Sequence, residues 1–306
     1  MVDLIGLANA LTDLTFDVTD EEVERIKAVK GFHRSEPEVD SAELHKVAGS
    51  KKKLVSQGGA PTNVVFGARK LGLKAGLFAT LGPDEYGKAY IDYLEKAGIK
   101  SFVETAKGPS GVCYVMITPD KERAVVSNLG VSVTHDYDLS NLDGAKMLFT
   151  SGYEIIANPR NVMNVLRNAK EKGLKLSLDM ADPGIIEPVR EQLAEVIKEL
   201  DVLFVTEEEA EAYVKKRPYE ALEELGKACP VVVLKKGAKG SVVRHDGVNY
   251  DIPVVPPAKL VNTNGAGDAY AAGFLTGFIN RMPVQRCGEL GAQNASKVCE
   301  REEAHL

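Results

Sequence analysis

The 306-residue sequence contains no tryptophan, only four cysteines and no long apolar run. The cysteines lie far apart, with no C-x-x-C pair and no histidine at ligand spacing, which argues against a disulfide framework or a zinc site. No stretch approaches the ~18 apolar residues of a membrane span, and the N-terminus MVDLIGLANA lacks the basic segment of a signal peptide. We therefore expect a cytoplasmic protein whose cysteines are small core residues.

Blocks of one charge sign are also missing. Asp and Glu number 44 against 38 Lys and Arg, and no block of like charge exceeds the short run at 51–53. Such a surface gives no reason to expect a nucleic-acid or membrane partner. The length and the 44% hydrophobic content suit one large domain, with or without an attached subdomain.

The second half of the sequence alternates between apolar runs and amphipathic stretches. Strands are expected at 146–150, 174–178, 202–205 and 231–234, with helices at 159–171 and 207–214. One further helix face is marked by Ile186, Val189, Leu193, Val196, Ile197 and Leu200. A hairpin is expected at Asp246-Gly247. The alternation predicts an α/β fold, a doubly wound and mostly parallel sheet flanked by helices.

Two earlier segments, 15–53 and 105–132, depart from this pattern. The first holds acidic helical pieces and the second short β segments. We expect them to form a small β-rich lid over a cleft, beside an α/β core of residues 1–14, 54–104 and 133–306. Arg123 lies in this lid and could reach a ligand, although a solvated arginine on a hairpin is the more ordinary interpretation.

The stretch 261–278 reads VNTNGAGDAYAAGFLTGF and joins a small-residue turn to a helix. Gly265, Ala266 and Gly267 leave their backbone N–H groups free to point at one target at the helix N-terminus. Such a place favours an anion, most often phosphate. Asp268 beside it suits a base that takes a proton from a hydroxyl attacking that phosphate. The alternative is that Asp268 only caps the helix.

A second glycine-rich segment, QGGAPTN at 57–63, precedes another predicted helix. Gly58 and Gly59 allow close backbone approach, and the Asn63 amide can donate to and accept from the hydroxyls of a polyhydroxylated ligand. The same residues could also be only a loop and a polar first turn. Asn9 and Asp13 follow the first predicted strand, where open α/β sheets bind ligands.

Polar or small residues also follow the later predicted strands. They are Asp179, Asp182, Thr206, Glu209, Gly237 and Gly240. Because the carboxyl ends of parallel strands share one edge of a sheet, we expect these residues and the 261–268 turn to line that edge. The two late glycines would let a nucleotide lie close to the backbone.

With these residues in hand, the sequence resembles the ribokinase/PfkB family of carbohydrate and nucleoside kinases over nearly its whole length. The likeness rests on G-G-x-x-x-N, from Gly58 to Asn63, followed late in the chain by G-A-G-D at 265–268. The resemblance implies a ribokinase-like kinase that uses ATP and Mg²⁺, and it leaves a monovalent cation open. It makes Asp268 the base and the amides of 265–267 the anion hole.

The resemblance also divides the expected site residues between two sides. On the acceptor side they are Asn9, Asp13, Gly58, Gly59, Asn63 and Arg123. On the nucleotide side they are Thr206, Lys236, Gly237, Gly240, Asn262, Thr263 and Asn294, with Glu209 at the magnesium ion. Two positions depart from the family pattern: Asn262 replaces the usual aspartate, and Thr206 replaces the asparagine of N-x-x-E. These departures put the ion preference in doubt.

Softer likenesses point to the adenosine kinase branch of the family. They are N-A-L-T-D at 9–13, T-N-G-A-G-D at 263–268, the hairpin at 118–123 and G-Y-E at 152–154. The leading hypothesis is therefore phosphorylation of a primary hydroxyl on a ribose-containing substrate, with a purine nucleoside such as adenosine first, by a monomer or homodimer.

Four other interpretations were weighed against that hypothesis. One is a sugar kinase for ribose, fructose or a keto-deoxy sugar acid, and another is a catalytically silent ligand sensor with the same fold. A phosphosugar acceptor is disfavoured, since no Lys or Arg cluster lies among the proposed substrate residues. A nicotinamide dehydrogenase is disfavoured because no G-x-G-x-x-G follows the first strand.

Overall fold

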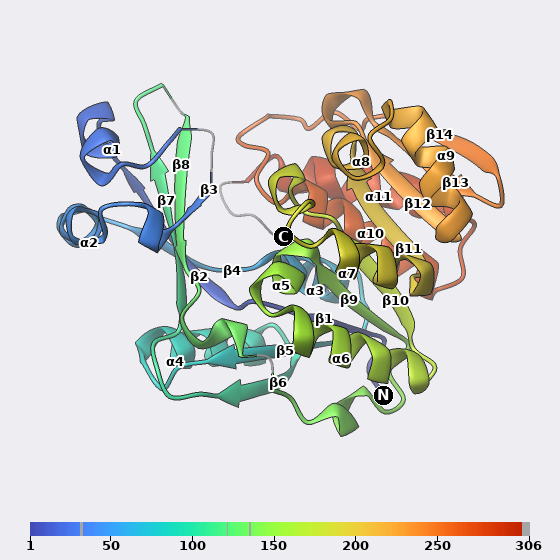
Figure 1. The fold of residues 1–306 in the computed structure, drawn as a ribbon, viewed down its shortest axis with the longest axis horizontal. Helices are drawn as coiled ribbons and strands as arrows, with labels where there is room; N and C mark the ends of the chain where they lie inside the picture. The colour runs from blue at the N-terminus through green and yellow to red at the C-terminus, as the bar shows by residue number, and fades with distance from the viewer. Residues whose placement is uncertain (31–32, 121, 135, 302–306) are drawn as a thin grey trace.

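A computed structural model of the chain describes residues 1–30, 33–120, 122–134 and 136–301. Two sheets organise these residues, one of nine strands and one of five (Figure 1). The last five residues of the predicted core, 302–306, lie outside the described residues, as does position 121 of the predicted lid hairpin.

The large sheet is mostly parallel. Across the sheet its described strands are β14 (Val248–Ile252), β13 (Ser241–His245), β12 (Val231–Lys235), β11 (Val202–Thr206), β10 (Lys175–Asp179), β9 (Met147–Ser151), β1 (Leu4–Leu7), β5 (Ala75–Leu81) and β6 (Lys100–Thr105). The strands from β12 to β6 pair in parallel, while β13 and β14 are antiparallel. This sheet confirms the predicted α/β fold.

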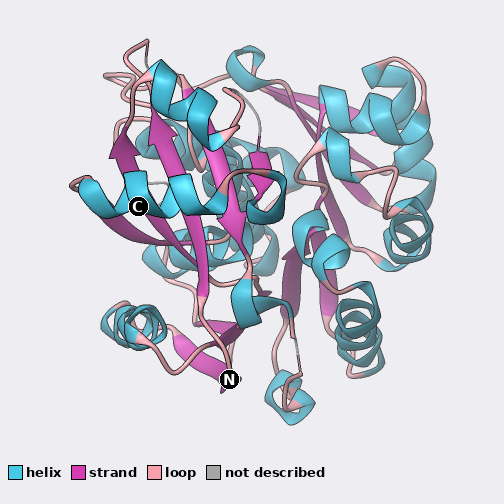
Figure 2. Ribbon diagram, turned by 60° about the vertical axis from the view of Figure 1, so that its left-hand side comes forward, coloured by secondary structure: helices cyan, strands magenta, loops and turns pink. Residues whose placement is uncertain are grey.

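Helices cover both faces of the large sheet (Figure 2). One face packs against α3 (Ala60–Lys70), α4 (Glu85–Lys96), α10 (Ala266–Ile279) and α11 (Val284–Val298). The other packs against α5 (Gly152–Ala157), α6 (Pro159–Glu171), α7 (Arg190–Val196), α8 (Glu207–Val214) and α9 (Pro218–Ala228). The arrangement is doubly wound, as the alternation of strands and helices predicted.

The two-residue period of the strands decides which face each side chain meets. In β12, Val231 and Val233 belong to the cluster under α10, whereas Val232 and Leu234 belong to the cluster under α7 to α9. Alternation of this kind is what a strand buried on both faces requires. Lys235, the last residue of β12, therefore shares the α10 face with Val233.

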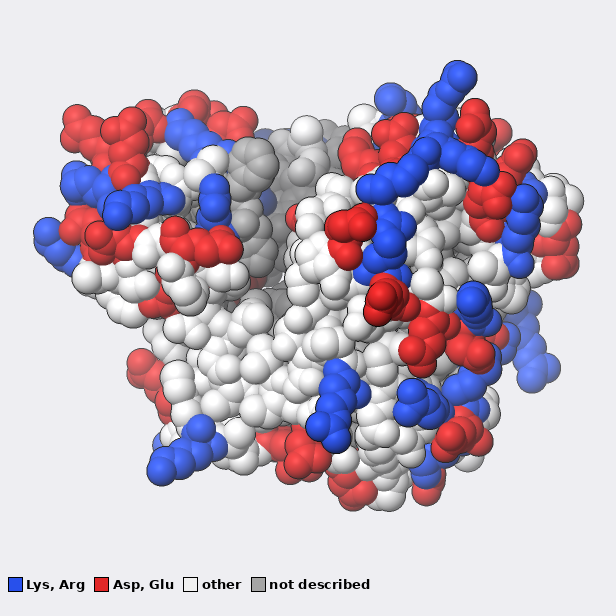
Figure 3. Space-filling view, viewed as in Figure 1, with Lys and Arg blue, Asp and Glu red and all other residues white. Residues whose placement is uncertain are grey.

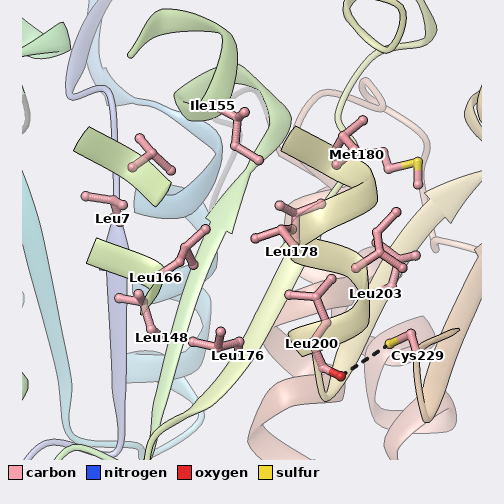
Figure 4. Packing of buried hydrophobic residues seen from close by; sticks show 14 of the residues in the cluster. Leu7, Leu148, Ile155, Leu166, Leu176, Leu178, Met180, Leu200, Leu203 and Cys229 are labelled. Atoms are coloured by element: carbon pink, nitrogen blue, oxygen red, sulfur yellow. Dashed lines mark hydrogen bonds between the residues drawn. The ribbon is translucent and has the colours of Figure 1, made fainter. Parts of the chain in front are cut away.

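Figure 4 shows the interior on the other face, where Leu148, Leu176 and Leu203 meet residues from the covering helices. Complete burial of a leucine side chain stabilises a fold by about 1.5–3 kcal/mol. Cys229 belongs to this cluster, and its Sγ lies 3.8 Å from the carbonyl oxygen of Leu200. All four cysteines are free thiols and three are buried, which confirms their expected place in the core.

Capping boxes begin three of the described α-helices, α1 (Asp20–Ile26), α5 and α8. In α5 the Ser151 hydroxyl and the Glu154 carboxylate satisfy the free N–H groups of the first turn, and Thr206 and Glu209 do the same in α8. Caps of this kind are worth about 1 kcal/mol each. Both boxes stand at the carboxyl edge of the large sheet, where they fix how the chain leaves β9 and β11.

The hairpin between β13 and β14 confirms the turn predicted at Asp246-Gly247. Asp246 has φ of 49° and Gly247 has φ of 76°. Positive φ at both positions is the conformation of a type I′ turn, which matches the twist of the flanking strands and favours the Asp-Gly pair.

The helix expected along the face from Ile186 to Leu200 is shorter than predicted. The regular helix α7 spans only Arg190–Val196 and is followed by a 3₁₀ turn at Ile197–Glu199. Pro188 explains the late start, because it has no N–H to donate and its ring blocks a preceding helical turn. The apolar residues of the face are nevertheless all buried.

The small sheet stands beside the large one, with α1 and α2 (Ser41–Ser50) over one of its faces (Figure 1). Its described strands, in order, are β3 (His33–Ser35), β8 (Arg123–Asn128), β7 (Gly111–Ile117), β2 (Leu11–Asp17) and β4 (Leu54–Gly58). The molecular surface is hollowed between the two parts, and acidic and basic side chains are interspersed over the face shown (Figure 3).

The boundaries of the small sheet differ from those predicted for the lid. Strands β2 and β4 extend it to Leu11 and Gly58, which had been assigned to the core. The predicted limits at 14 and 54 fall inside or at the start of these strands, because the chain passes between the sheets at Asn9-Ala10 and Gly59. The role of this part as a lid remains a prediction.

None of the described helices combines the length and the apolar character needed to cross a membrane.

Candidate active site

Polar side chains gather where the parallel strands of the large sheet end. Asp179, the last residue of β10, lies opposite Ser151 of β9, and Thr206 of β11 lies opposite Lys235 of β12. Helices α3 and α10 pack against each other on the same face of the sheet. In open α/β sheets this carboxyl edge is the usual place for ligands.

The N-terminus of α10 faces this edge without a side-chain cap among the described residues. Its N-cap residue is Gly265, with φ of 72°, a left-handed conformation that glycine adopts without strain. Helix α10 is 14 residues long, so its first amides carry the partial positive charge of a full helix. The backbone N–H of Ala266 already donates a 3.2 Å hydrogen bond to the Thr263 carbonyl. The anion site expected at 265–267 stays a prediction.

Asp268 lies in the first turn of α10 and bonds across to α3. Its Oδ2 accepts a hydrogen bond of 2.8 Å from Nδ2 of Asn63. Burial raises the pKa of Asp268 to about 7, with the Asn63 hydrogen bond opposing and the Asp179 carboxylate reinforcing the rise. A contact with another helix, rather than with the backbone of its own helix, weakens the interpretation of Asp268 as a mere cap.

Asp13 lies on the acceptor side, where the charge of Asp268 acts on its carboxyl group. The sequence predicted that Asp13 would follow the first strand. In the structure it is part of strand β2 of the small sheet. Burial raises the pKa of Asp13 to about 7, and the charge of Asp268 adds to the rise. Two carboxyl groups in one partly buried site compete for ionisation, so their titrations are linked.

The paired glycines are required by close contacts with this acceptor side. A Cβ on Gly58 would overlap both carboxylate oxygens of Asp13, so any side chain there would displace the carboxylate. Gly59 has φ of 106°, and a Cβ on it would lie 2.6 Å from the carbonyl oxygen of Asn9. The glycines therefore bring β4 against the residues that the sequence placed in the acceptor site.

Asn9 and Asn63 both hold a side-chain carbonyl oxygen that has no partner among the described residues. Their side chains are almost wholly buried, at 3% and 8% exposure. A buried acceptor without a donor costs about 1–3 kcal/mol, and such atoms in a site commonly await a ligand group. Hydroxyl groups, which donate, suit these two oxygens.

Glu154 supports the acceptor side and was not assigned a role from the sequence. Its Oε1 accepts a 2.9 Å hydrogen bond from the backbone N–H of Asn9, and its Oε2 accepts one of 2.6 Å from the Ser151 hydroxyl. Burial raises the pKa of Glu154 to about 7. The sequence signals were the S-x-x-E capping pattern, which a helix start alone would explain, and the G-Y-E likeness at 152–154.

Lys235 is a cation at this edge of the sheet. The sequence had instead predicted its neighbour, Lys236, as a contact of the nucleotide. Lys235 Nζ lies 2.5 Å from Oδ2 of Asp179, with the two side chains 15% and 6% exposed. A Cβ on Gly267 would lie 3.4 Å from the same Nζ, so the ammonium group faces the turn of α10. Burial lowers the pKa of Lys235, but the carboxylates of Asp179 and Glu209 outweigh it and hold the pKa above its usual range.

Lys236, which was predicted to contact the nucleotide, points to the opposite face. Its Nζ lies 3.2 Å from the Tyr219 hydroxyl of α9 and 3.8 Å from an oxygen of Asp251. The prediction is corrected by these contacts, because Lys236 lies just past the end of β12 and turns to α9, whereas the period of the strand places Lys235 on the α10 face. That period, extended from Val233, could have identified Lys235 from the sequence.

Glu209 and Thr206 are held to each other in the capping box of α8. Glu209 Oε2 accepts a 2.9 Å hydrogen bond from the backbone N–H of Thr206, and burial raises the pKa of the Glu209 carboxyl. Across the described part of the chain, no three Asp, Glu, His or Cys side chains are grouped closely enough to hold a metal ion. The role of Glu209 beside a magnesium ion therefore stays a prediction.

The loops before α10 and after β12 hold the remaining nucleotide-side candidates. Gly237 has φ of 55° and open space where a Cβ would stand, whereas a Cβ on Gly240 would overlap the Ile252 carbonyl oxygen. Asn262 Oδ1 accepts a 2.7 Å hydrogen bond from the backbone of Asn264, which shapes the turn. Thr263 is exposed beside it.

Two other candidates, Asn294 and Arg123, lie away from the side chains described so far, and their contacts with ligands stay predictions. Asn294 of α11 is 1% exposed, and its Nδ2 donates to the Ala269 carbonyl of α10 at 2.7 Å, while its Oδ1 has no partner among the described residues. Arg123 pairs with Ile117 at the far end of the small sheet. Ile117 lies four residues along β7 from the residue that pairs with Asp13, and four residues of strand correspond to ~13 Å.

Comparisons with known proteins agree with this geometry. The family model of pfkB family carbohydrate kinases matches residues 36–306. Adenosine kinase of Saccharomyces cerevisiae is 28% identical over 94% of this chain and 92% of its own length. A 5-dehydro-2-deoxygluconokinase of Geobacillus kaustophilus is 29% identical over 79% of this chain and 78% of its own length.

The fold is also that of solved structures. The crystal structure of adenosine kinase from Sinorhizobium meliloti matches 100% of this chain and 96% of its own, with a TM-score of 0.90 and 22% identity. At this level of identity the likeness shows the fold alone.

Proposed function

The chain belongs to the PfkB family of carbohydrate kinases, and from this premise we propose that it transfers the γ-phosphate of ATP to the primary hydroxyl of a purine nucleoside, with adenosine as the preferred acceptor. A phosphotransferase with a hydroxyl acceptor is what the family match shows. The observation that carries the finer proposal is Asp268, held by Asn63 at the uncapped N-terminus of α10. Similarity to the yeast adenosine kinase over nearly the full length supports the choice of acceptor.

Asp268 acts as the general base in this mechanism. Its ionised carboxylate accepts the proton of the acceptor hydroxyl while that oxygen attacks the γ-phosphorus, and the bond to the β-phosphate oxygen breaks to release ADP. A pKa of about 7 makes the carboxylate basic enough to take the proton and still ionised in about half of the molecules at neutral pH.

The amides of Gly265 and Gly267 stabilise the charge on the phosphoryl oxygens, since the Ala266 N–H donates to the Thr263 carbonyl. They are fixed by the helix before the reaction begins, so they need no rearrangement in the transition state. A magnesium ion bound with ATP would neutralise charge on the β- and γ-phosphates. Mg²⁺ is commonly held by one or two carboxylates together with phosphates, and Glu209 at this edge fits that manner of binding.

The ribose hydroxyls would bind the acceptor side. Asp13 accepts hydrogen bonds, and the partnerless oxygens of Asn9 and Asn63 supply two more acceptors. Closure of the small sheet over the large one would exclude water, which otherwise competes with the acceptor for the phosphate. The links at Asn9-Ala10 and Gly59 are the places where such a movement would turn.

The adenine base of ATP would lie outside the carboxyl edge, on the loop that precedes α10. Val254, Leu260 and Val261 are large apolar residues of this loop that remain 41–63% exposed. Gly240 packs against the backbone at Val254, so this surface adjoins the turn after β12. Exposed apolar side chains beside an anion site suit a flat, weakly polar ring.

The alternative acceptor is a free sugar, which the similarity to a 5-dehydro-2-deoxygluconokinase favours. The test is the rate of ADP release with adenosine, inosine, cytidine, ribose, fructose and a keto-deoxy sugar acid. We expect the highest kcat/KM with adenosine, and a loss of tenfold or more with 2′-deoxyadenosine, because a missing hydroxyl leaves a buried acceptor unpaired. A higher kcat/KM for a free sugar would reject the nucleoside assignment, and ATP turnover that no acceptor changes would revive the ligand-sensor interpretation.

A further inference from the structure

One lysine lies among three carboxyl groups at the carboxyl edge of the large sheet. Lys235 contacts Asp179 directly, and the charges of Glu209 and Asp268 also act on its ammonium group. If all four groups were ionised, the cluster would carry a net charge of −2, which would repel a triphosphate. Lys235 offsets one of these three negative charges at the edge where the phosphates would bind.

The direction of Lys235 gives it a second target besides Asp179. An ammonium group has three N–H donors, and the contact with Asp179 uses one. Gly267 of the α10 turn lies close to Nζ, and its lack of a side chain leaves open the space that a Cβ 3.4 Å from Nζ would fill. A phosphate oxygen bound on the turn amides would come within reach of Nζ.

We propose that Lys235 contacts the phosphate that this kinase transfers and supplies a protein-borne positive charge at the anion hole. The inference rests on the function proposed above. Asp179 is then the partner that competes with the phosphate for the lysine ammonium group.

The consequence is that the protein binds a polyphosphate without a metal ion. The simple alternative is a structural ion pair, in which Lys235 only neutralises the nearly buried Asp179. The two accounts differ in what happens to polyphosphate affinity, as distinct from stability, when each partner is changed.

The experiment measures binding of inorganic tripolyphosphate in EDTA, by calorimetry and by the ligand-induced change in Tm. The matched pair is Lys235→Gln and Lys236→Gln, adjacent lysines of which the first contacts Asp179 and the second contacts Tyr219 of α9. We expect Lys235→Gln to weaken binding about ten- to a hundredfold, the loss of one charge-assisted hydrogen bond, and Lys236→Gln to change it less than about twofold. Asp179→Asn should bind at least as tightly as the wild type, because the lysine loses a competing partner.

If Lys235→Gln does not fold, the double variant Asp179→Asn/Lys235→Gln takes its place in the experiment, because the double variant leaves no unpaired charge buried. It should bind tripolyphosphate about ten- to a hundredfold more weakly than Asp179→Asn alone. Equal affinity of these two proteins overturns the inference, and so does a loss in Asp179→Asn as large as that in Lys235→Gln.

Failure of the inference is distinguishable from failure of the proposed function. A wild-type protein that binds MgATP but no tripolyphosphate in EDTA contradicts the role of Lys235 alone. A wild-type protein that binds neither contradicts the kinase site itself.

Discussion

Replacement of Asp268 by asparagine removes the proposed base and almost nothing else. The amide has the shape of the carboxyl group, and its Oδ1 can accept the hydrogen bond that Asn63 donates at 2.8 Å. The backbone amides of the α10 turn do not change. We therefore expect the fold and ATP binding to remain, with the KM for ATP within about twofold, and kcat to fall by ~10²–10⁴, the usual range for a lost general base.

The same change should stabilise the protein at alkaline pH. Asp268 has a pKa of about 7 in the folded state against an ordinary value of 3.8, so its ionisation opposes folding. One pKa unit corresponds to ~1.4 kcal/mol, which sets an upper limit of ~4 kcal/mol on the gain in the free energy of unfolding at pH 8. The partial exposure of Asp268 makes the gain smaller. It should shrink as pH falls from 7 to 4, where the carboxyl is protonated in the folded state.

The assays are steady-state ADP release and urea unfolding at pH 8 and pH 5. Asp251→Asn is the control, since that carboxylate is 81% exposed and lies outside the site. It should leave both kcat and unfolding nearly unchanged. A value of kcat for Asp268→Asn within tenfold of the wild type would refute the base assignment, and a loss of stability at pH 8 would refute the account of its pKa.

Three further predictions follow from the same contacts. The acid limb of kcat/KM for the acceptor should fall with an apparent pKa near 7, because Asp268 and Asp13 must be ionised; a limb near pH 4 would contradict this. Gly58→Ala should raise the KM for the acceptor tenfold or more by displacing Asp13, while Gly49→Ala, with no atom within 4 Å, should not change it. Thr206→Ala should lower the free energy of unfolding by about 1 kcal/mol through loss of the α8 cap, and an unchanged urea midpoint would count against that cap.

The fold could be predicted because it depends on patterns that repeat. Each strand of the second half is a short apolar run followed by a helix with one apolar face, and such units assemble into a parallel sheet. The hairpin at Asp246-Gly247 was predictable from the positive φ that a type I′ turn imposes. The prediction of a helix along 186–200 was wrong in its bounds, because Pro188 prevents a helical turn before it although six apolar residues lie at helical spacing.

The candidate site could be predicted where its residues are consecutive, or nearly so, in the sequence. The turn at 265–268 and the glycine pair at 58–59 lie close in sequence to the atoms they serve. The juxtaposition of Asn63 with Asp268, by contrast, depends on the packing of α3 on α10, which no local pattern specifies.

The errors concern residues whose direction depends on the surrounding structure. Lys235 and Lys236 are identical in type, and only their contacts distinguish the lysine that faces α10 from the one that faces α9. The contact of Asn294 with the Ala269 carbonyl joins α11 to α10, and no local pattern of the sequence specifies it. Glu154 acts through the backbone of Asn9, and such a bond between distant segments leaves no sequence signature.

The most direct test of the central claim follows the labelled γ-phosphate of ATP in the presence of adenosine and an equal concentration of ribose. The account predicts that the label appears on the 5′-oxygen of adenosine, and that Asp268→Asn forms this product at least a hundredfold more slowly. Label found mainly on ribose, or released only as inorganic phosphate, would contradict it.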